Sequence, residues 1–200
     1  ELFERQARGY VLTDRGHDLL NKVAGLADQI SPIETMAALD KPPMVKVSAG
    51  TWVTQYLCQN VDAIAGTDSV SLRFIAAEHV LDIAHREAVI GIRNHRPEQL
   101  GLAGRRIGRI QFATYAISDT IQTWIRVSGS TPSARWVETN VHKGPSIEVT
   151  SARNALDLLL VGAGVAVLPT FIGDACKTLL QIAPPIDELE HDQWLVTHNE

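Results

Sequence analysis

The sequence has few cysteines, no excess of basic residues and no long apolar run. Two cysteines in 200 residues give no disulfide framework, and such scarcity is typical of a reducing compartment. Cys58 and Cys176 lie on predicted helices among apolar neighbours, where a free cysteine usually packs, and a redox-sensing role is the alternative. No segment has the length of a membrane span or the form of a signal peptide. We therefore expect a cytoplasmic protein with no membrane partner.

The charge balance and the motifs exclude other classes. The formal net charge is −5, which is unusual for an isolated nucleic-acid-binding domain. The sequence contains no G-x-S-x-G, no H-E-x-x-H and no phosphate-binding loop. Gly162 and Gly164 precede a predicted strand, so they do not form a dinucleotide fingerprint, and the seven histidines lack metal-ligand spacing. We expect no enzymatic activity, no cofactor and no metal.

An amphipathic helical pattern with a seven-residue repeat follows the first dozen residues. We expect a helix from about Thr13, which can serve as the N-cap, to about Gln29, and a second short helix from Ser31-Pro32 to about Leu39. The apolar stripe is narrow and its flanks are polar, which favours a partner helix over packing on the chain's own domain. The stripe that we assign to dimerisation consists of Leu19, Val23, Leu26 and Ile30.

Asp40-Lys41-Pro42-Pro43 has the composition of a hinge, and after it strands and helices alternate. The rhythm is typical of α/β units with a sheet. The first half is predicted to contain strands at 44–49, 70–76, 88–93 and 109–117 and helices at 51–64 and 79–86. The second half is predicted to contain helices at 120–127, 152–161 and 171–177 and strands at 134–137, 147–149, 165–168, 179–182 and 193–197.

The amino-terminal residues 2–20 read L-F-E-R-Q-A-R-G-Y-V-L-T-D-R-G-H-D-L-L. This stretch resembles the wing and first linker-helix turn of LysR-type bacterial transcription regulators, whose pattern is roughly L-F-x-R-x-x-R-x-x-x-L-T-x-x-G-x-x-L-L. Gly9 suits the turn between two wing strands. Arg5 and Arg8 could reach DNA phosphates beside a groove. The resemblance implies a recognition helix upstream of residue 1, so DNA binding would use that helix-turn-helix together with the wing.

Later segments resemble the same family. Residues 162–169 match the family pattern G-x-G-[IV]-[AG]-x-[LV]-P. Residues 88–93 are similar to its D-[LV]-A-I-R strand, with Ala88 in place of the acidic residue. Residues 193–198 resemble its return strand, after which the family usually continues into a further helix. The resemblance implies an α/β fold in which two subdomains, periplasmic-binding-protein-like (type 2), follow a linker helix and a remnant of a winged helix-turn-helix. The implied domains are a wing remnant at 1–12, a linker/dimerisation helix at 13–40, effector subdomain I at 44–118 and 192–200, and effector subdomain II at 119–191.

Two strand-to-helix junctions have chemistry suited to a small anion. Each combines hydroxyl groups with a helix amino terminus, and open α/β sheets bind ligands at such ends. An ordinary capping role explains the hydroxyls of Thr51 and Ser151 equally well. For Arg93 an ordinary exposed surface arginine is the favoured interpretation. The effector-binding candidates are Ser48, Gly50, Thr51, Trp52, Arg93, Thr114, Thr150 and Ser151.

Two function classes remain open. The first is a LysR-like regulator, a homodimer or homotetramer that binds DNA and a small anionic effector. The second is a two-lobed solute-binding protein, which shares the architecture, so that fold alone does not separate them. The wing-like motif and the seven-residue repeat favour the regulator.

Overall fold

The computed structural model describes residues 2–6, 9–20, 22–23, 44–66, 70–76, 90–99, 101–141 and 144–198. The chain divides into two compact units, Glu1–Pro43 and Met44–Glu200, which we consider separately. Several expectations lie outside the described residues: Arg8, the helix ending near Leu39, the stripe positions Leu26 and Ile30, and the helix at 79–86. Within the described residues, no helix is long and apolar enough to cross a membrane.

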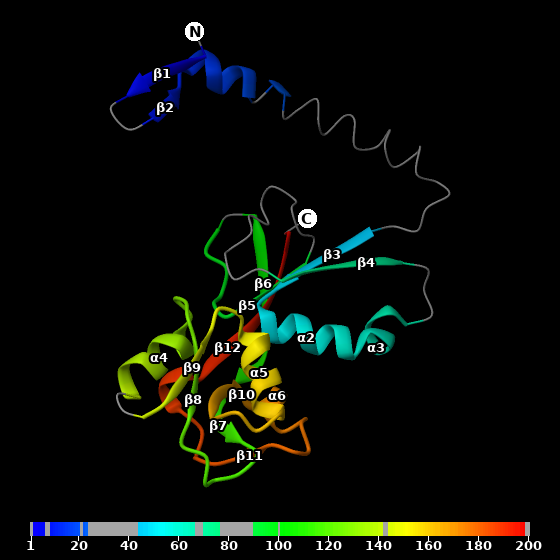
Figure 1. Ribbon diagram of the computed structural model, residues 1–200. Coiled ribbons are helices and arrows are strands. Elements are labelled where there is room, and N and C mark those ends of the chain that lie inside the picture. Colours follow the sequence, from blue (N-terminus) through cyan, green and yellow to red (C-terminus); the bar gives the residue numbers. More distant parts are fainter. Residues whose placement is uncertain are drawn as a thin grey trace. The chain divides into compact units, whose positions relative to one another are not determined.

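The first unit is a hairpin followed by a helix (Figure 1). Strands β1 (Phe3–Gln6) and β2 (Gly9–Leu12) pair antiparallel, and residues 14–20 and 22–23 are helical. The expected N-cap is confirmed, because the hydroxyl of Thr13 accepts a hydrogen bond of 3.1 Å from the backbone N–H of Gly16. Any side chain at position 16 would collide with the carbonyl oxygen of Leu2. The glycine of the motif therefore lets the helix start lie against the hairpin.

The second unit begins with a five-stranded mixed sheet in the order β4-β3-β5-β12-β6. Strand β3 runs parallel to β4 and β5, whereas β12 runs antiparallel to β5 and β6. The last strand of the chain therefore lies between two strands from its middle, as Figure 1 shows in red beside green. The strands are β3 (Met44–Ala49), β4 (Ser71–Ala76), β5 (Ile90–Arg93), β6 (Leu102–Ile110) and β12 (His191–His198).

One helix of the prediction is two in the structure. Helix α2 (Thr51–Gln59) contacts β3 and β4, and α3 (Val61–Ala65) continues after a break at Asn60. The backbone N–H of Asn60 donates to the carbonyl oxygens of Tyr56 and Leu57, and its side-chain amide donates to Tyr56 as well. Asparagine competes in this way for backbone acceptors, and the expected single helix at 51–64 is therefore wrong at its centre.

The expected strand at 109–117 also proves to be parts of two strands. Strand β6 ends at Ile110, Gln111 lies outside both strands, and β7 (Phe112–Ala116) belongs to another sheet. That sheet has the order β10-β7-β11, with β10 (Ala166–Pro169) and β11 (Leu180–Gln181) on either side. The chain crosses between the two sheets at Gln111, whose side-chain amide donates to Glu190 at 2.9 Å, directly before the returning β12.

Two short elements of the second half are the reverse of the prediction. Residues expected as a helix at 120–127 contain strand β8 (Trp124–Val127), which pairs parallel with β9 (Ser146–Val149). Its β-branched and aromatic side chains suit a strand. Residues expected as a strand at 134–137 lie in α4 (Pro132–Asn140). The hydroxyl of Thr131 caps this helix and proline occupies its first turn, a start signal that the prediction missed.

The remaining elements pack around the three-stranded sheet β10-β7-β11. Helix α5 (Ala152–Leu160) and β10 agree with the prediction to within a residue or two, whereas α6 (Thr170–Gly173) is shorter than expected and is followed later by the 3-10 helix η2 (Asp187–Leu189). The main cluster of buried residues lies here, and it includes Tyr115, Leu156, Leu159 and Leu168. Trp52 of α2 packs against this cluster, so α2 joins the two halves (Figure 1).

Candidate functional site

The ends of β3 and β5 are joined by a buried polar contact. Ser48 is fully buried, and the guanidinium of Arg93 donates to its carbonyl oxygen at 2.8 Å and to its hydroxyl at 3.1 Å. A further bond of 3.0 Å reaches the carbonyl oxygen of Ile92. Burial lowers the pKa of the Arg93 guanidinium. The interpretation of Arg93 as an ordinary exposed arginine is therefore wrong, because its fork holds two parallel strands at their carboxyl ends.

The amino terminus of α2 follows directly from Ser48. Gly50 occupies the N-cap position with φ −65° and ψ 163°, so Thr51 is the first helical residue and its hydroxyl is not in the cap position. A side chain built at Gly50 meets nothing within 4 Å. The hydroxyl of Thr54 donates to the carbonyl oxygen of Ala49 at 3.2 Å, which holds the junction in place. The side-chain position of Gly50 therefore faces open space at the start of α2.

The amino terminus of α5 has a comparable arrangement. Ser151 occupies its N-cap position, but its side chain makes no capping hydrogen bond. Thr150 before it is exposed. Neither α2 nor α5 has an acidic residue in its first turn, and Arg153 of α5 pairs with Asp157 at 3.3 Å. Both helix starts thus keep the positive end of their dipole uncompensated by acidic residues of the first turn, which favours a bound anion.

The other expected site residues have different surroundings. Thr114 is 5% exposed in the central strand of the three-stranded sheet, where it lies opposite Val167. Its carbonyl oxygen accepts a hydrogen bond from the backbone of Ile182 at 2.9 Å. These contacts assign Thr114 to the sheet interior. Trp52 is half-buried and has a packing role against the second core.

The residues expected to bind DNA and a second copy lie in the first unit. Arg5 is on β1 opposite Tyr10, and Arg8 lies outside the described residues. Leu19 and Val23 leave about half of their surface exposed, 45% and 53% respectively. Two positions of the expected dimerisation stripe are thus uncovered in the single chain.

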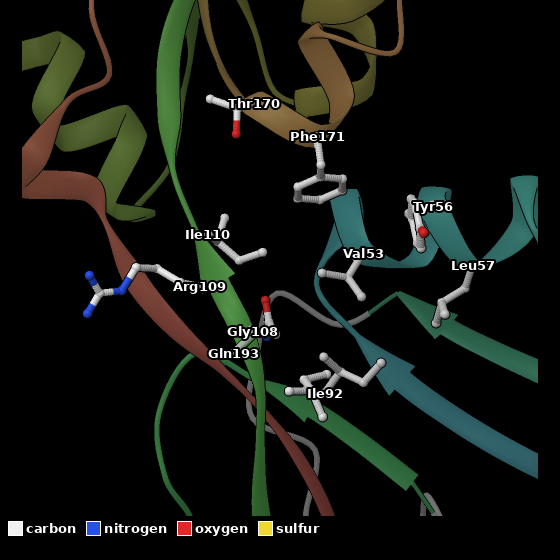
Figure 2. A pocket seen from close by; sticks show the side chains of 11 residues that line it. Val53, Tyr56, Leu57, Ile92, Gly108, Arg109, Ile110, Thr170, Phe171 and Gln193 are labelled. Atoms are coloured by element: carbon white, nitrogen blue, oxygen red, sulfur yellow. The ribbon is translucent and has the colours of Figure 1, made fainter.

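A pocket that the sequence did not indicate lies beside β12. It encloses about 330 Å³ between α2, the five-stranded sheet and α6 (Figure 2). Its buried polar group is Gln193, which is 5% exposed and donates to the carbonyl oxygen of Arg93 at 2.8 Å. Thr170 and Arg109 also line it. A glutamine at an inward position of an apolar strand was the available signal. Within the described residues, no three histidine, cysteine or acidic side chains gather as metal ligands.

The chain is similar to several solved structures. The CrgA regulatory domain, a LysR-type transcriptional regulator from Neisseria meningitidis, matches with a TM-score of 0.59 and 16% identity over 79% of this chain and 90% of that chain. Full-length LysG from Corynebacterium glutamicum with bound effector Arg matches with a TM-score of 0.57 and 15% identity over 100% and 77%. Full-length AphB, the Vibrio cholerae virulence activator, matches with a TM-score of 0.57 and 15% identity over 100% and 78%.

The chain has the fold of LysR-type regulators. Its separate five-stranded and three-stranded sheets are consistent with the two-subdomain, type 2 periplasmic-binding-protein-like fold that the family resemblance implied. No protein-family model and no curated protein matches the sequence. At identities of 15% and 16% the similarity shows the fold, and function is argued from the site itself.

Proposed function

We propose that this chain is the regulatory part of a LysR-type transcriptional regulator, with the end of its DNA-binding domain. The single observation that carries this proposal is the first unit. This unit consists of a hairpin and a helix whose N-cap is Thr13, and two apolar residues of the expected dimerisation stripe, Leu19 and Val23, are exposed. A two-lobed solute-binding protein, the alternative, needs none of these features. We propose a cytoplasmic regulator that acts as a homodimer or homotetramer and has no enzymatic activity.

The proposed effector is a small anion that binds between residues 48–52 and 150–151. Three observations support this proposal. The first turns of α2 and α5 contain no acidic residue, a Cβ at Gly50 would face open space, and the hydroxyl of Ser151 makes no capping hydrogen bond. Contact between α2 and α5, together with Trp52 on the second core, supports one shared site. The neighbour LysG has a bound effector, arginine, which supports an effector role for this fold.

Binding at this place would change the relation of the two subdomains. The ligand would contact β3–α2 of the first sheet and β9–α5 of the second, so it would bind best when these junctions approach each other. Such differential affinity shifts the equilibrium between conformations, and a dimer can transmit that shift to DNA. Gln111, which connects β6 with β7 and bonds to Glu190, is the proposed hinge about which the two sheets rotate relative to each other.

A regulator and a solute-binding protein differ in whether the full-length protein selects particular DNA sequences. Duplexes from a random pool would be bound by the full-length protein and sequenced after several rounds. A regulator enriches one sequence family, whereas this 200-residue chain alone should enrich none, because its net charge is negative and the family resemblance places the recognition helix outside it. A full-length protein that enriches no sequence, yet binds a small solute as a monomer, would favour the alternative.

A further inference from the structure

The walls of the pocket beside β12 are mostly apolar. Val53 and Leu57 of α2, Ile92 of β5, Ile110 of β6 and Phe171 of α6 surround it (Figure 2). The ring of Tyr56 stands edge-on to that of Phe171, with centroids 5.8 Å apart. Its volume of about 330 Å³ is in the range of small-molecule sites, which are mostly apolar with a few placed polar groups.

One polar group faces this pocket in a fixed orientation. The side-chain nitrogen of Gln193 donates to the backbone carbonyl of Arg93 at 2.8 Å and to Asn94 Oδ1 at 3.3 Å. A carbonyl oxygen can only accept, so the amide cannot be reversed and its oxygen must point the other way. Figure 2 shows that oxygen directed into the pocket. A bound molecule with an O–H or N–H group can therefore donate to this oxygen.

The charges around the pocket disfavour an anion. Arg109 lines the pocket, but its guanidinium extends away from it (Figure 2) and pairs with Glu190 at 2.9 Å and with Asp192 at 3.7 Å. No other cationic side chain of the described residues is among the residues that line the space. A carboxylate inside would face the negative end of the Gln193 amide without a compensating charge, which is unfavourable in an apolar surrounding.

We propose that this pocket binds a neutral small molecule with an apolar, preferably aromatic, body and one O–H or N–H group that donates to the side-chain oxygen of Gln193. This site is separate from the anionic effector site, and its ligand class is different. The volume of the pocket limits the size of the ligand, and its apolar walls favour an apolar ligand. The fixed acceptor oxygen of Gln193 requires a hydrogen-bond donor on the ligand.

A matched set of probes tests the ligand class on the 200-residue chain. The set is 2-naphthol, which carries a donor and is neutral at neutral pH, 2-methoxynaphthalene, which has the same body without a donor, and 2-naphthoate, which is anionic. Equilibrium dialysis should find that 2-naphthol binds about tenfold more tightly than the methyl ether, as expected when one hydrogen bond is lost. The carboxylate should bind more weakly than either. Equal binding of naphthol and ether, or no binding of naphthol at its solubility limit, would overturn the proposal.

A filling variant tests the location. Gly108 of β6 lies directly opposite Gln193, so a side chain there points to the same face of the sheet, and a Cβ at this position meets nothing within 4 Å. Gly108→Leu should therefore fill the pocket without backbone strain and reduce 2-naphthol affinity at least about tenfold. Ala103→Leu places the same side chain on the same strand outside the pocket lining and should leave the affinity unchanged. Unaltered binding in folded Gly108→Leu protein would place the ligand elsewhere and refute the proposal.

Discussion

The guanidinium of Arg93 holds Ser48 by both its carbonyl oxygen and its hydroxyl, at 2.8 Å and 3.1 Å. The two residues are 45 positions apart in the sequence, and they end two parallel strands. Because Gln193 in turn bonds to the carbonyl oxygen of Arg93, the contact connects the proposed effector junction with the returning strand. The geometry of the β3–α2 junction therefore depends on the guanidinium of Arg93 and not only on the backbone of β3.

The first prediction concerns this fork. Arg93→Lys should lower the free energy of unfolding by about 1–3 kcal/mol, because one ammonium group cannot reproduce several directed bonds from a guanidinium. Urea denaturation measures the loss. Arg96→Lys is a suitable control, since Arg96 is exposed, lies 5.9 Å from the centre of the Trp194 ring, and should change stability little when replaced. Equal losses in both variants would mean that the Ser48 contact contributes nothing particular.

The second prediction concerns self-association through the stripe. Leu19→Asp should raise the dimer dissociation constant about a hundredfold or more, because each Leu19 that a dimer buries contributes about 1.5–3 kcal/mol. His17→Asp adds the same charge on the far side of the helix and should have a small effect. Sedimentation velocity over a range of concentrations separates the two variants. A wild-type chain that is monomeric at tens of micromolar would show that the stripe packs within one chain.

The third prediction concerns the wing. In the full-length protein, Arg5→Ala and Arg8→Ala should each weaken DNA binding for all sequences. Because each arginine would neutralise one phosphate, either substitution should reduce the slope of log affinity against log salt by about 0.9. Fluorescence anisotropy at several salt concentrations gives that slope. A weakening confined to one operator sequence, with the slope unchanged, would indicate base contacts instead.

The fourth prediction concerns alkaline pH. Tyr115 is 1% exposed and donates to Asp174 Oδ1 at 2.6 Å. Burial, together with the hydrogen bond and the negative charge of Asp174, raises the pKa of Tyr115 above its ordinary value near 10. The folded protein therefore holds this proton more tightly than the unfolded chain. The resulting stability is complete below about pH 10 and falls as the pH rises toward the folded pKa.

Urea denaturation from about pH 8 to about pH 11 tests this behaviour. Tyr115→Phe should cost about 1 kcal/mol at neutral pH, because the hydrogen bond to Asp174 is lost. Above about pH 10 the variant should lose less stability per pH unit than the wild type. An identical alkaline decline in the two proteins would assign the effect to other groups.

The sequence predicted those elements whose patterns are local. Strand β3 and helix α5 are dense apolar segments bounded by glycine, proline or hydroxyl residues, and they appear where expected. The segment at 124–127 was misassigned because its strand character comes from distant partners. The backbone of Ile125 donates to the carbonyl oxygen of Val165 at 2.8 Å, and β8 pairs with β9. Such pairing overrides a helical pattern in a short apolar segment.

The site was predictable only in part for the same reason. Glycine and hydroxyl residues next to a predicted helix indicated the two junctions. The bond from Arg93 to Ser48 and the bond from Gln193 to Arg93 span 45 and 100 positions, and no local pattern indicates such pairs. The pocket depends on β12 lying between β5 and β6, which follows from the chain's topology and not from any one segment.

We propose that a small anion binds between residues 48–52 and 150–151, and calorimetric titration measures such binding. Inorganic phosphate, sulfate and a panel of mono- and dicarboxylates would be titrated into the wild type, Thr51→Ala, Thr150→Val and Gly50→Leu, with Thr120→Val as a control on an exposed loop. At least one anion should bind the wild type and the control equally. It should bind Thr51→Ala and Thr150→Val about tenfold more weakly, and Gly50→Leu not measurably. Equal affinity in all five folded proteins, or no anion bound by the wild type, would contradict the account.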